Sequence, residues 1–182
     1  MTNTEVITFD RAISLSTDLI YAFERGESTI ENASEHLDKI VSTANGARGF
    51  FVALLTGESN LANNLPPEFI DVLKSHPDVV CDLLVKNLVM SATMAVTHER
   101  NGDKKSADGS RSVNSKTKSI ICRMDCSEMT RQIHSMKDAI QNKVQTGTDD
   151  HPSEYAPFLA RWRYDAEQLK EALTALSEFD TQ

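Results

Sequence analysis

The residues best suited to chemistry are two cysteines and a histidine in the second half of the chain. Cys122 and Cys126 are four residues apart, and His134 follows eight residues later. On one continuous helix these side chains fall near a common side, where thiolate and imidazole groups could bind a metal ion or take part in redox chemistry. Cys81 and His98, on the preceding predicted helix, could complete a set of four ligands.

The same cysteines also fit a purely structural role. Cys126 continues into the apolar positions Met129, Ile133 and Met136 at helical spacing, and a buried free cysteine usually packs as a small hydrophobic side chain. A disulfide between Cys122 and Cys126 is disfavoured, because Cβ atoms one helical turn apart exceed the ~3.8 Å separation that the bond needs. We therefore expect both cysteines to pack in the core, and the metal or redox site is the alternative.

A second candidate site is a cluster of positive charge between residues 98 and 123. This segment has seven lysines and arginines against three acidic residues, so it carries +4 in a chain whose formal net charge is -8. Such a segment could bind an acidic partner or a phosphate group, or it could be a solvated loop. No aromatic residues interleave the cations, which makes nucleic acid an unlikely partner. The residues predicted to bind a partner or a phosphate group are Arg100, Lys104, Lys105, Arg111, Lys116 and Lys118.

The sequence motifs of the common catalytic sites are absent. The chain has no glycine-rich phosphate loop ending in Lys-Ser or Lys-Thr, no Gly-x-Ser-x-Gly and no His-Glu-x-x-His. The only tryptophan, Trp162, stands between Arg161 and Arg163, which would suit a protein contact. We expect Trp162 in the core instead, because it shares a helical stripe with Phe158 and Leu169. We therefore predict no catalytic residue and no cofactor.

Helices must position all these residues, because helical periodicity runs through most of the chain. Apolar residues recur every three or four positions in segments that end at glycine, such as Gly26 and Gly102. The apolar run 47–56 could be a strand or a helix, and we predict a helix because no second strand is available for pairing. We therefore predict an all-α bundle of about six or seven helices.

The central part of the chain is predicted to contain one loop and one long helix. Residues 102–110 are rich in Lys, Asp, Ser and Gly, so we expect a mobile basic loop there. Beyond it, periodicity without Gly or Pro predicts a single helix near residues 112–145. That helix would be ~50 Å long, whereas a compact domain of this size is ~41 Å across. We therefore predict a homodimer with the helix ends at the interface.

Length and composition limit the number of domains, the kinds of partner and the location. A chain of 182 residues that is 40% hydrophobic and 25% charged suits one helical domain over residues 1–182. No signal-peptide pattern and no uninterrupted apolar run of membrane-spanning length is present, and three cysteines do not form a disulfide framework. The net charge of -8 argues against nucleic acids and anionic membranes as partners. We expect a cytoplasmic location.

These observations favour a non-enzymatic helical interaction or regulatory protein with a protein partner. The alternative is a helical protein that binds a small molecule, haem or a metal ion, and that could be an enzyme. Its site would use Cys81, His98, Cys122, Cys126 or His134.

Overall fold

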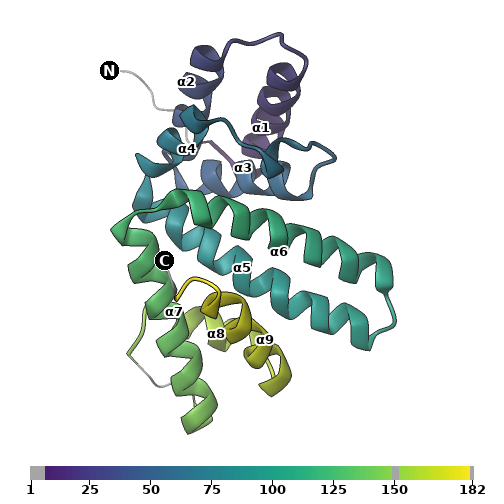
Figure 1. Cartoon of the computed structure of the whole chain (residues 1–182), viewed down its shortest axis with the longest axis vertical. Helices are drawn as coiled ribbons and strands as arrows, with labels where there is room; N and C mark the ends of the chain where they lie inside the picture. The colour runs from purple at the N-terminus through teal and green to yellow at the C-terminus, as the bar shows by residue number, and fades with distance from the viewer. Residues whose placement is uncertain (1–6, 149–151, 181–182) are drawn as a thin grey trace. The chain divides into compact units, whose positions relative to one another are not determined.

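The computed structural model describes residues 7–148 and 152–180, and these residues form nine α-helices and one short 3-10 helix. No strand occurs within those two ranges, so the predicted all-α class is confirmed, with more helices than expected (Figure 1). Contacts between Cα atoms group the chain into two compact units, residues 1–83 and 84–182. We describe each unit by itself, and the single domain over 1–182 stays a prediction.

The first unit is a small cluster of helices. Its elements are α1 (Phe9–Glu24), α2 (Ile30–Val41), α3 (Ala44–Thr56), the 3-10 helix η1 (Leu61–Asn63) and α4 (Pro67–Lys74). A threonine side chain caps each of the first three helices by accepting a hydrogen bond from a backbone amide of the first turn, and these residues are Thr8, Thr29 and Thr43. The helix predicted over 47–56 is confirmed as part of α3, which runs across α1 and α2 (Figure 1).

Large apolar side chains form the core of the first unit. Phe50 and Phe51 of α3 and Phe69 of α4 are fully buried, and the ring of Phe23 on α1 lies 5.2 Å from that of Phe69. Burial of such side chains is the main source of stability for helices that would be marginal alone. The core therefore fixes α1, α3 and α4 against one another.

Helix α5 (Pro77–Arg100) begins in the first unit and continues into the second. By length and composition alone it is long and apolar enough to cross a membrane, but 61% of its most apolar stretch is buried within the fold. The core helix of a globular protein meets the same criteria, so this is weak evidence for a membrane span. The absence of a spanning segment stays a prediction.

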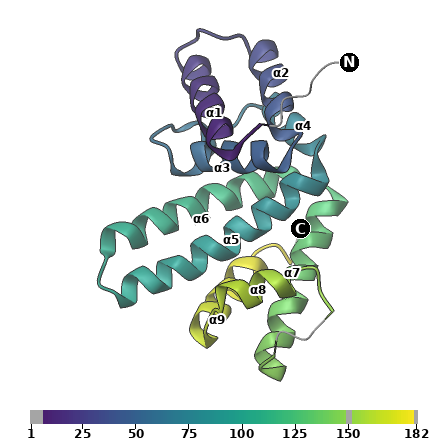
Figure 2. The same ribbon diagram turned by 180° about the vertical axis from the view of Figure 1, so that it is seen from behind.

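The second unit contains the rest of α5 and four further helices, α6 (Lys104–Met124), α7 (Ser127–Thr146), α8 (Ala156–Trp162) and α9 (Ala166–Ser177) (Figure 2). The predicted loop over 102–110 is wrong, because α6 already begins at Lys104. Gly102 makes the turn after α5 with φ +72°, and the Asp103 carboxylate caps α6 by accepting from the Ser106 amide at 3.0 Å. Ala107 is fully buried, which holds the first turns of α6 in place.

The single helix predicted near 112–145 is also wrong, because α6 and α7 are separate. The chain bends at Asp125 (φ 11°) and is extended at Cys126 (φ -147°). Met124 and Met129 are both buried, and a continuous helix would place Ser127 and Glu128 on that stripe instead. The bend lets both apolar stripes pack. The length argument for a homodimer therefore fails, and the dimer needs other support.

The helical stripe expected to contain Phe158, Trp162 and Leu169 is divided between two helices, α8 and α9. Arg163 ends α8 in the left-handed conformation (φ 50°). Asp165 then caps α9, its carboxylate accepting from the Glu167 and Gln168 amides at 3.0 Å. The Gln168 side chain donates to the Thr97 hydroxyl of α5 at 2.8 Å, which connects α9 to α5.

Candidate functional site

A groove between α1 and α3 in the first unit is the candidate site. The two helices come closest where Gly49 of α3 meets Ala12 of α1, because a Cβ on Gly49 would lie 2.5 Å from that of Ala12. Both residues are buried, and only glycine and alanine permit such an approach. Since two crossed helices separate on either side of their closest point, larger side chains further along line an open space.

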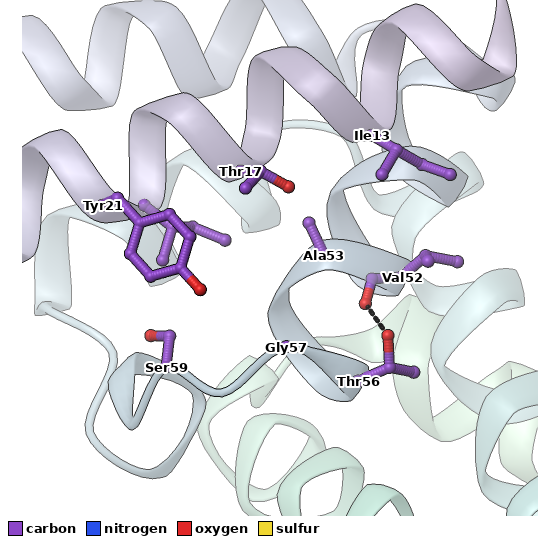
Figure 3. Close-up of a pocket in the computed structure, with 9 residues that line it drawn as sticks. Ile13, Thr17, Tyr21, Val52, Ala53, Thr56, Gly57 and Ser59 are labelled. Atoms are coloured by element: carbon purple, nitrogen blue, oxygen red, sulfur yellow. Dashed lines mark hydrogen bonds between the residues drawn. The ribbon is translucent and has the colours of Figure 1, made fainter.

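The groove has a volume of about 160 Å³ and is lined mainly by apolar surface. Its lining residues are Ile13, Thr17, Ile20, Tyr21, Val52, Ala53, Thr56, Gly57 and Ser59. Thr17 and Ala53 face each other across it, with Tyr21 and Ser59 towards one end and Val52 towards the other (Figure 3). Tyr21 is 38% exposed and Val52 is 37% exposed. Two large apolar side chains of the groove are thus in contact with water.

Several polar atoms of the groove are used within the fold. The Thr56 hydroxyl donates to the Val52 carbonyl at 2.7 Å (Figure 3). The Ser59 hydroxyl donates to the Glu24 carboxylate at 2.6 Å and accepts from the Leu61 amide at 3.0 Å. None of the nine lining residues carries a carboxylate, an imidazole, a thiol or an amine. The groove is therefore suited to apolar contact rather than to proton transfer or metal binding.

The unit that contains the groove carries the net charge of the chain. Residues 1–83 include 13 acidic and 5 basic residues, which gives -8, whereas residues 84–182 include 14 of each, which gives zero. Glu24 lies at one end of the groove through its contact with Ser59, and exposed Glu58 follows Gly57 of the lining. A partner that approaches the groove thus meets a negative field.

The predicted cationic site is divided among ion pairs of the second unit. Arg100 binds Asp165 and Glu167, Arg111 binds Glu99 and Asp108, and Lys118 binds Glu178 at 2.5 Å. These contacts raise the pKa of the two arginines, with the hydrogen bonds to the carboxylates as the largest cause. Lys116 also takes part in an interaction. Of the six predicted residues, Lys104 and Lys105 are the exposed ones outside these ion pairs, and both lie in the first turn of α6.

The predicted cysteine and histidine site is not brought together on one helix. Cys122 lies on α6 and is exposed, Cys126 precedes α7 and is half-buried, and His134 is exposed on α7. The expectation that Cys122 packs in the core is therefore wrong. Cys81 is buried in the first unit, and His98 lies half-buried on α5 in the second. Among the residues that the structure describes, no three His, Cys, Asp or Glu side chains are grouped for a metal ion.

A second hollow lies on the surface of the second unit and is polar. It has a volume of about 450 Å³ and is lined by Arg131, His134, Ser135, Asp138, Pro152, Ser153 and Glu154. Its only arginine is already bound by Glu154 at 2.9 Å and by Glu128 at 2.7 Å. The hollow therefore offers an anion no unpaired arginine.

Beside this hollow, a polar network links α7 to the segment before α8. The buried Tyr155 hydroxyl donates to the Gln132 side-chain oxygen, and the Gln132 amide donates to Glu128 at 2.7 Å. The hydrogen bonds from Arg131 and then from Gln132 lower the pKa of Glu128 to about 2. Each polar group therefore has a partner, as a buried network requires.

An aromatic cluster closes the C-terminal end of α8. The rings of Trp162 and Tyr164 are parallel within 4°, with centroids 6.3 Å apart, and Phe158 meets Tyr164 edge-on at 6.2 Å. Trp162 is 41% exposed, so the expectation that it lies in the core is wrong. Tyr164 is buried, and its hydroxyl has no hydrogen-bond partner among the described residues. Burial raises the pKa of Tyr164 to about 12.

The groove was not predictable from sequence motifs because its residues are ordinary helix residues. Ile13, Thr17, Ile20 and Tyr21 recur at intervals of three or four, which indicates one face of a helix but not an open one. The available signal was Gly49, which stands inside an apolar run where any residue other than proline would favour a helix more. Such a glycine often marks a close approach of two backbones.

One protein family matches the chain. The family described as "Uncharacterised conserved protein UCP020893" matches residues 8–179, a range that covers both compact units. No curated protein and no solved structure matches the chain significantly.

Proposed function

The chain belongs to this uncharacterised family over residues 8–179, and we propose a function for it from the groove between α1 and α3. The protein is a non-enzymatic interaction protein, and the groove between α1 and α3 binds an apolar segment of a protein partner. We propose a cytoplasmic location for this role.

The observation that carries the proposal is the open groove with Tyr21 and Val52 partly exposed on its two helices. Soluble proteins bury most large apolar side chains, and exposed ones gathered at a concave site commonly mark a protein interface. The described part of the chain has only two further large apolar side chains with comparable exposure, Val144 and Trp162. Of the four exposed large apolar side chains among the described residues, two thus lie at this groove.

The size of the groove supports a protein segment over a free small molecule. Pockets for small-molecule ligands have volumes of roughly 300–1,000 Å³, whereas the groove holds about 160 Å³. That space suits one apolar side chain of a larger partner. The larger hollow on the second unit is polar and its arginine is already paired. The alternative of a small-molecule, haem or metal protein is therefore less well supported.

The test compares two aspartate variants at exposed valines. Val52→Asp places a charge in the groove, while Val144→Asp places the same charge on α7, where the valine is 54% exposed. Affinity purification from the native cells should recover a stoichiometric partner with the wild-type protein and with Val144→Asp. The partner should be lost with Val52→Asp, whose helical circular dichroism should stay unchanged because the site is exposed.

Two results would contradict the proposal. In one, Val52→Asp retains the partner at the wild-type ratio. In the other, Val52→Asp and Val144→Asp lose it equally, which would indicate a general effect of the added charge.

A further inference from the structure

We propose that the groove between α1 and α3 of one copy of the chain binds Trp162 of a second copy. This inference rests on the proposed function, because it names an occupant for the same groove. It also supports the predicted homodimer by an argument that does not use the length of a helix. The contact has two halves, and the described residues supply both of them.

The first half is an exposed indole with a fixed orientation. Trp162 is the last residue of α8 and remains 41% exposed while its ring lies parallel to that of Tyr164. Tyr164 is buried and is also contacted by Phe158, so the surface under the indole is firmly packed. An aromatic side chain that is already ordered loses little conformational entropy when it binds, which favours its use as an anchor.

Two cations flank this indole in the sequence, and neither has an ion-pair partner among the described residues. Arg161 and Arg163 are exposed, and neither has an ion pair with another described residue, unlike Arg100 and Arg111 of the same unit. The backbone of Arg163 is left-handed, which ends α8 and directs the chain away from the helix axis. The end of α8 thus presents an apolar ring between two positive charges.

The second half is a groove of matching size. A cavity of about 150 Å³ lined by apolar side chains is large enough for a benzene ring, and the groove has about 160 Å³. The six-membered ring of an indole therefore fits it. Tyr21 at one end could contact that ring as an aromatic neighbour, and Val52 lies towards the other end (Figure 3).

The charges of the two halves are complementary. The groove belongs to a unit with a net charge of -8. Glu24 lies at its end through Ser59, and exposed Glu58 follows the lining residue Gly57. Two unpaired arginines that approach such a surface gain attraction and faster association, and this gain should decrease with added salt.

A second copy is an occupant for which the described residues of the chain supply both surfaces. In the reciprocal form of the proposed contact, the groove of each copy binds Trp162 of the other. Such a reciprocal arrangement uses both sites and closes as a dimer with two-fold symmetry. A basic aromatic segment of an unrelated protein has the same chemistry, and the test below separates it from a second copy.

The single tryptophan makes the test direct, because indole emission reports on Trp162 alone. Light scattering and fluorescence should be measured on the full chain from low to high micromolar concentration, at low and at high salt. We expect the mass to rise from 20.2 kDa towards twice that value. Over the same concentrations the emission should shift to shorter wavelength, since the indole leaves water. At least a tenfold higher concentration should be needed at high salt.

Three variants identify the contact. Val52→Asp should abolish both the rise in mass and the emission shift. Because this substitution makes the first unit more acidic, it would strengthen an association that depends on charge alone. Arg161→Gln with Arg163→Asn should weaken association at least tenfold, and asparagine tolerates the left-handed conformation of residue 163. Val144→Asp should behave as the wild type, because Val144 lies outside both halves.

The inference is overturned if the mass stays at 20.2 kDa with unchanged emission through high micromolar concentration. It is also overturned if the chain dimerises without the emission shift, or if Val52→Asp dimerises as well as the wild type. A monomer that still loses its native partner through Val52→Asp would refute the second copy as occupant and leave the proposed function intact.

Discussion

The two compact units are held together in different ways. In the first unit α1 and α3 meet at Ala12 and Gly49, and the lysine and arginine ion pairs between described residues, Arg25–Glu27 and Lys39–Glu35, are local in sequence. In the second unit ion pairs join distant segments, including Arg100–Asp165, Lys118–Glu178 and Lys137–Asp180. The second unit pairs several of its cations internally and has no net charge, whereas the first keeps an unbalanced charge of -8. The acidic unit is therefore the better candidate for binding a partner.

If close packing holds the first unit, Gly49→Ala should have the largest effect on stability. The new Cβ would lie 2.5 Å from the Ala12 Cβ and 2.8 Å from backbone atoms of Ala12 and Ile13. Because backbone must move to make room, we expect a loss of about 3 kcal/mol in the free energy of unfolding. Urea unfolding followed by circular dichroism measures it.

The matched control is Gly109→Ala on α6, where an added Cβ meets nothing within 4 Å. This change should stabilise the protein by roughly 0.5–1 kcal/mol, because alanine favours a helix more than glycine does. Equal effects of the two substitutions would show that the Ala12–Gly49 contact is not what holds the first unit.

If polar contacts hold the second unit, its stability should depend on pH through Glu128. Its pKa is lowered from 4.5 to about 2 in the folded chain, so the ionised carboxylate stabilises the fold above pH 4.5. This contribution should be lost as the pH falls from 4.5 towards 2. The pKa difference sets an upper bound of about 3 kcal/mol, and the solvent-accessible ion pair with Arg131 brings the expected value closer to about 1 kcal/mol.

Glu128→Gln should therefore lower the free energy of unfolding at pH 7 and match the wild type near pH 2. The control is Glu171→Gln on α9, an exposed residue outside the Arg131 network. A constant difference between Glu128→Gln and the wild type across this pH range would assign the loss to packing instead of charge.

Two buried tyrosines of the second unit give the smallest expected effects, with opposite signs. Tyr155→Phe removes the hydrogen bond to Gln132 and should cost about 1 kcal/mol. Tyr164→Phe removes a hydroxyl that has no hydrogen-bond partner among the described residues, so it should be neutral or stabilising by up to about 1 kcal/mol. Thermal unfolding at pH 7 measures both.

Alkaline pH adds a check on Tyr164. Its pKa is raised from 10 to about 12, so the unfolded chain loses this proton first and the wild type should lose stability as the pH rises above 10. Tyr164→Phe should lack that part of the loss. A destabilised Tyr164→Phe variant would show that the hydroxyl has a partner in solution.

The helical class was predictable because apolar spacing and capping residues are local signals. The run 47–56 was predicted as a helix, and it lies within α3, which begins earlier at Ala44 after the N-cap Thr43. The bend at Asp125 has neither Gly nor Pro, and its only trace in the sequence is the five-residue step between Met124 and Met129. Residues 102–110 have the composition of a loop. The single helix-capping residue Asp103 is a weaker signal than that composition, so the start of α6 at Lys104 was not predicted.

The site was less predictable than the fold. A groove depends on which residue of one helix meets which residue of another, and sequence periodicity does not specify that pairing. The same holds for Arg100 and Arg111, whose carboxylate partners Asp165 and Glu99 lie 65 and 12 residues away. Counting charges along the sequence therefore overestimated how many of these cations are available to bind a partner.

Helix α5 has a consequence for attempts to divide the chain. The boundary between the units falls between Leu83 and Leu84, inside this continuous helix. A fragment that ends at Leu83 would lose most of α5, and one that starts at Leu84 would begin in mid-helix without a cap. Leu84, Val85 and Leu88 are fully buried, so the helix cannot be shortened freely on that side. Fragments meant to fold alone should therefore overlap and each retain residues 77–100.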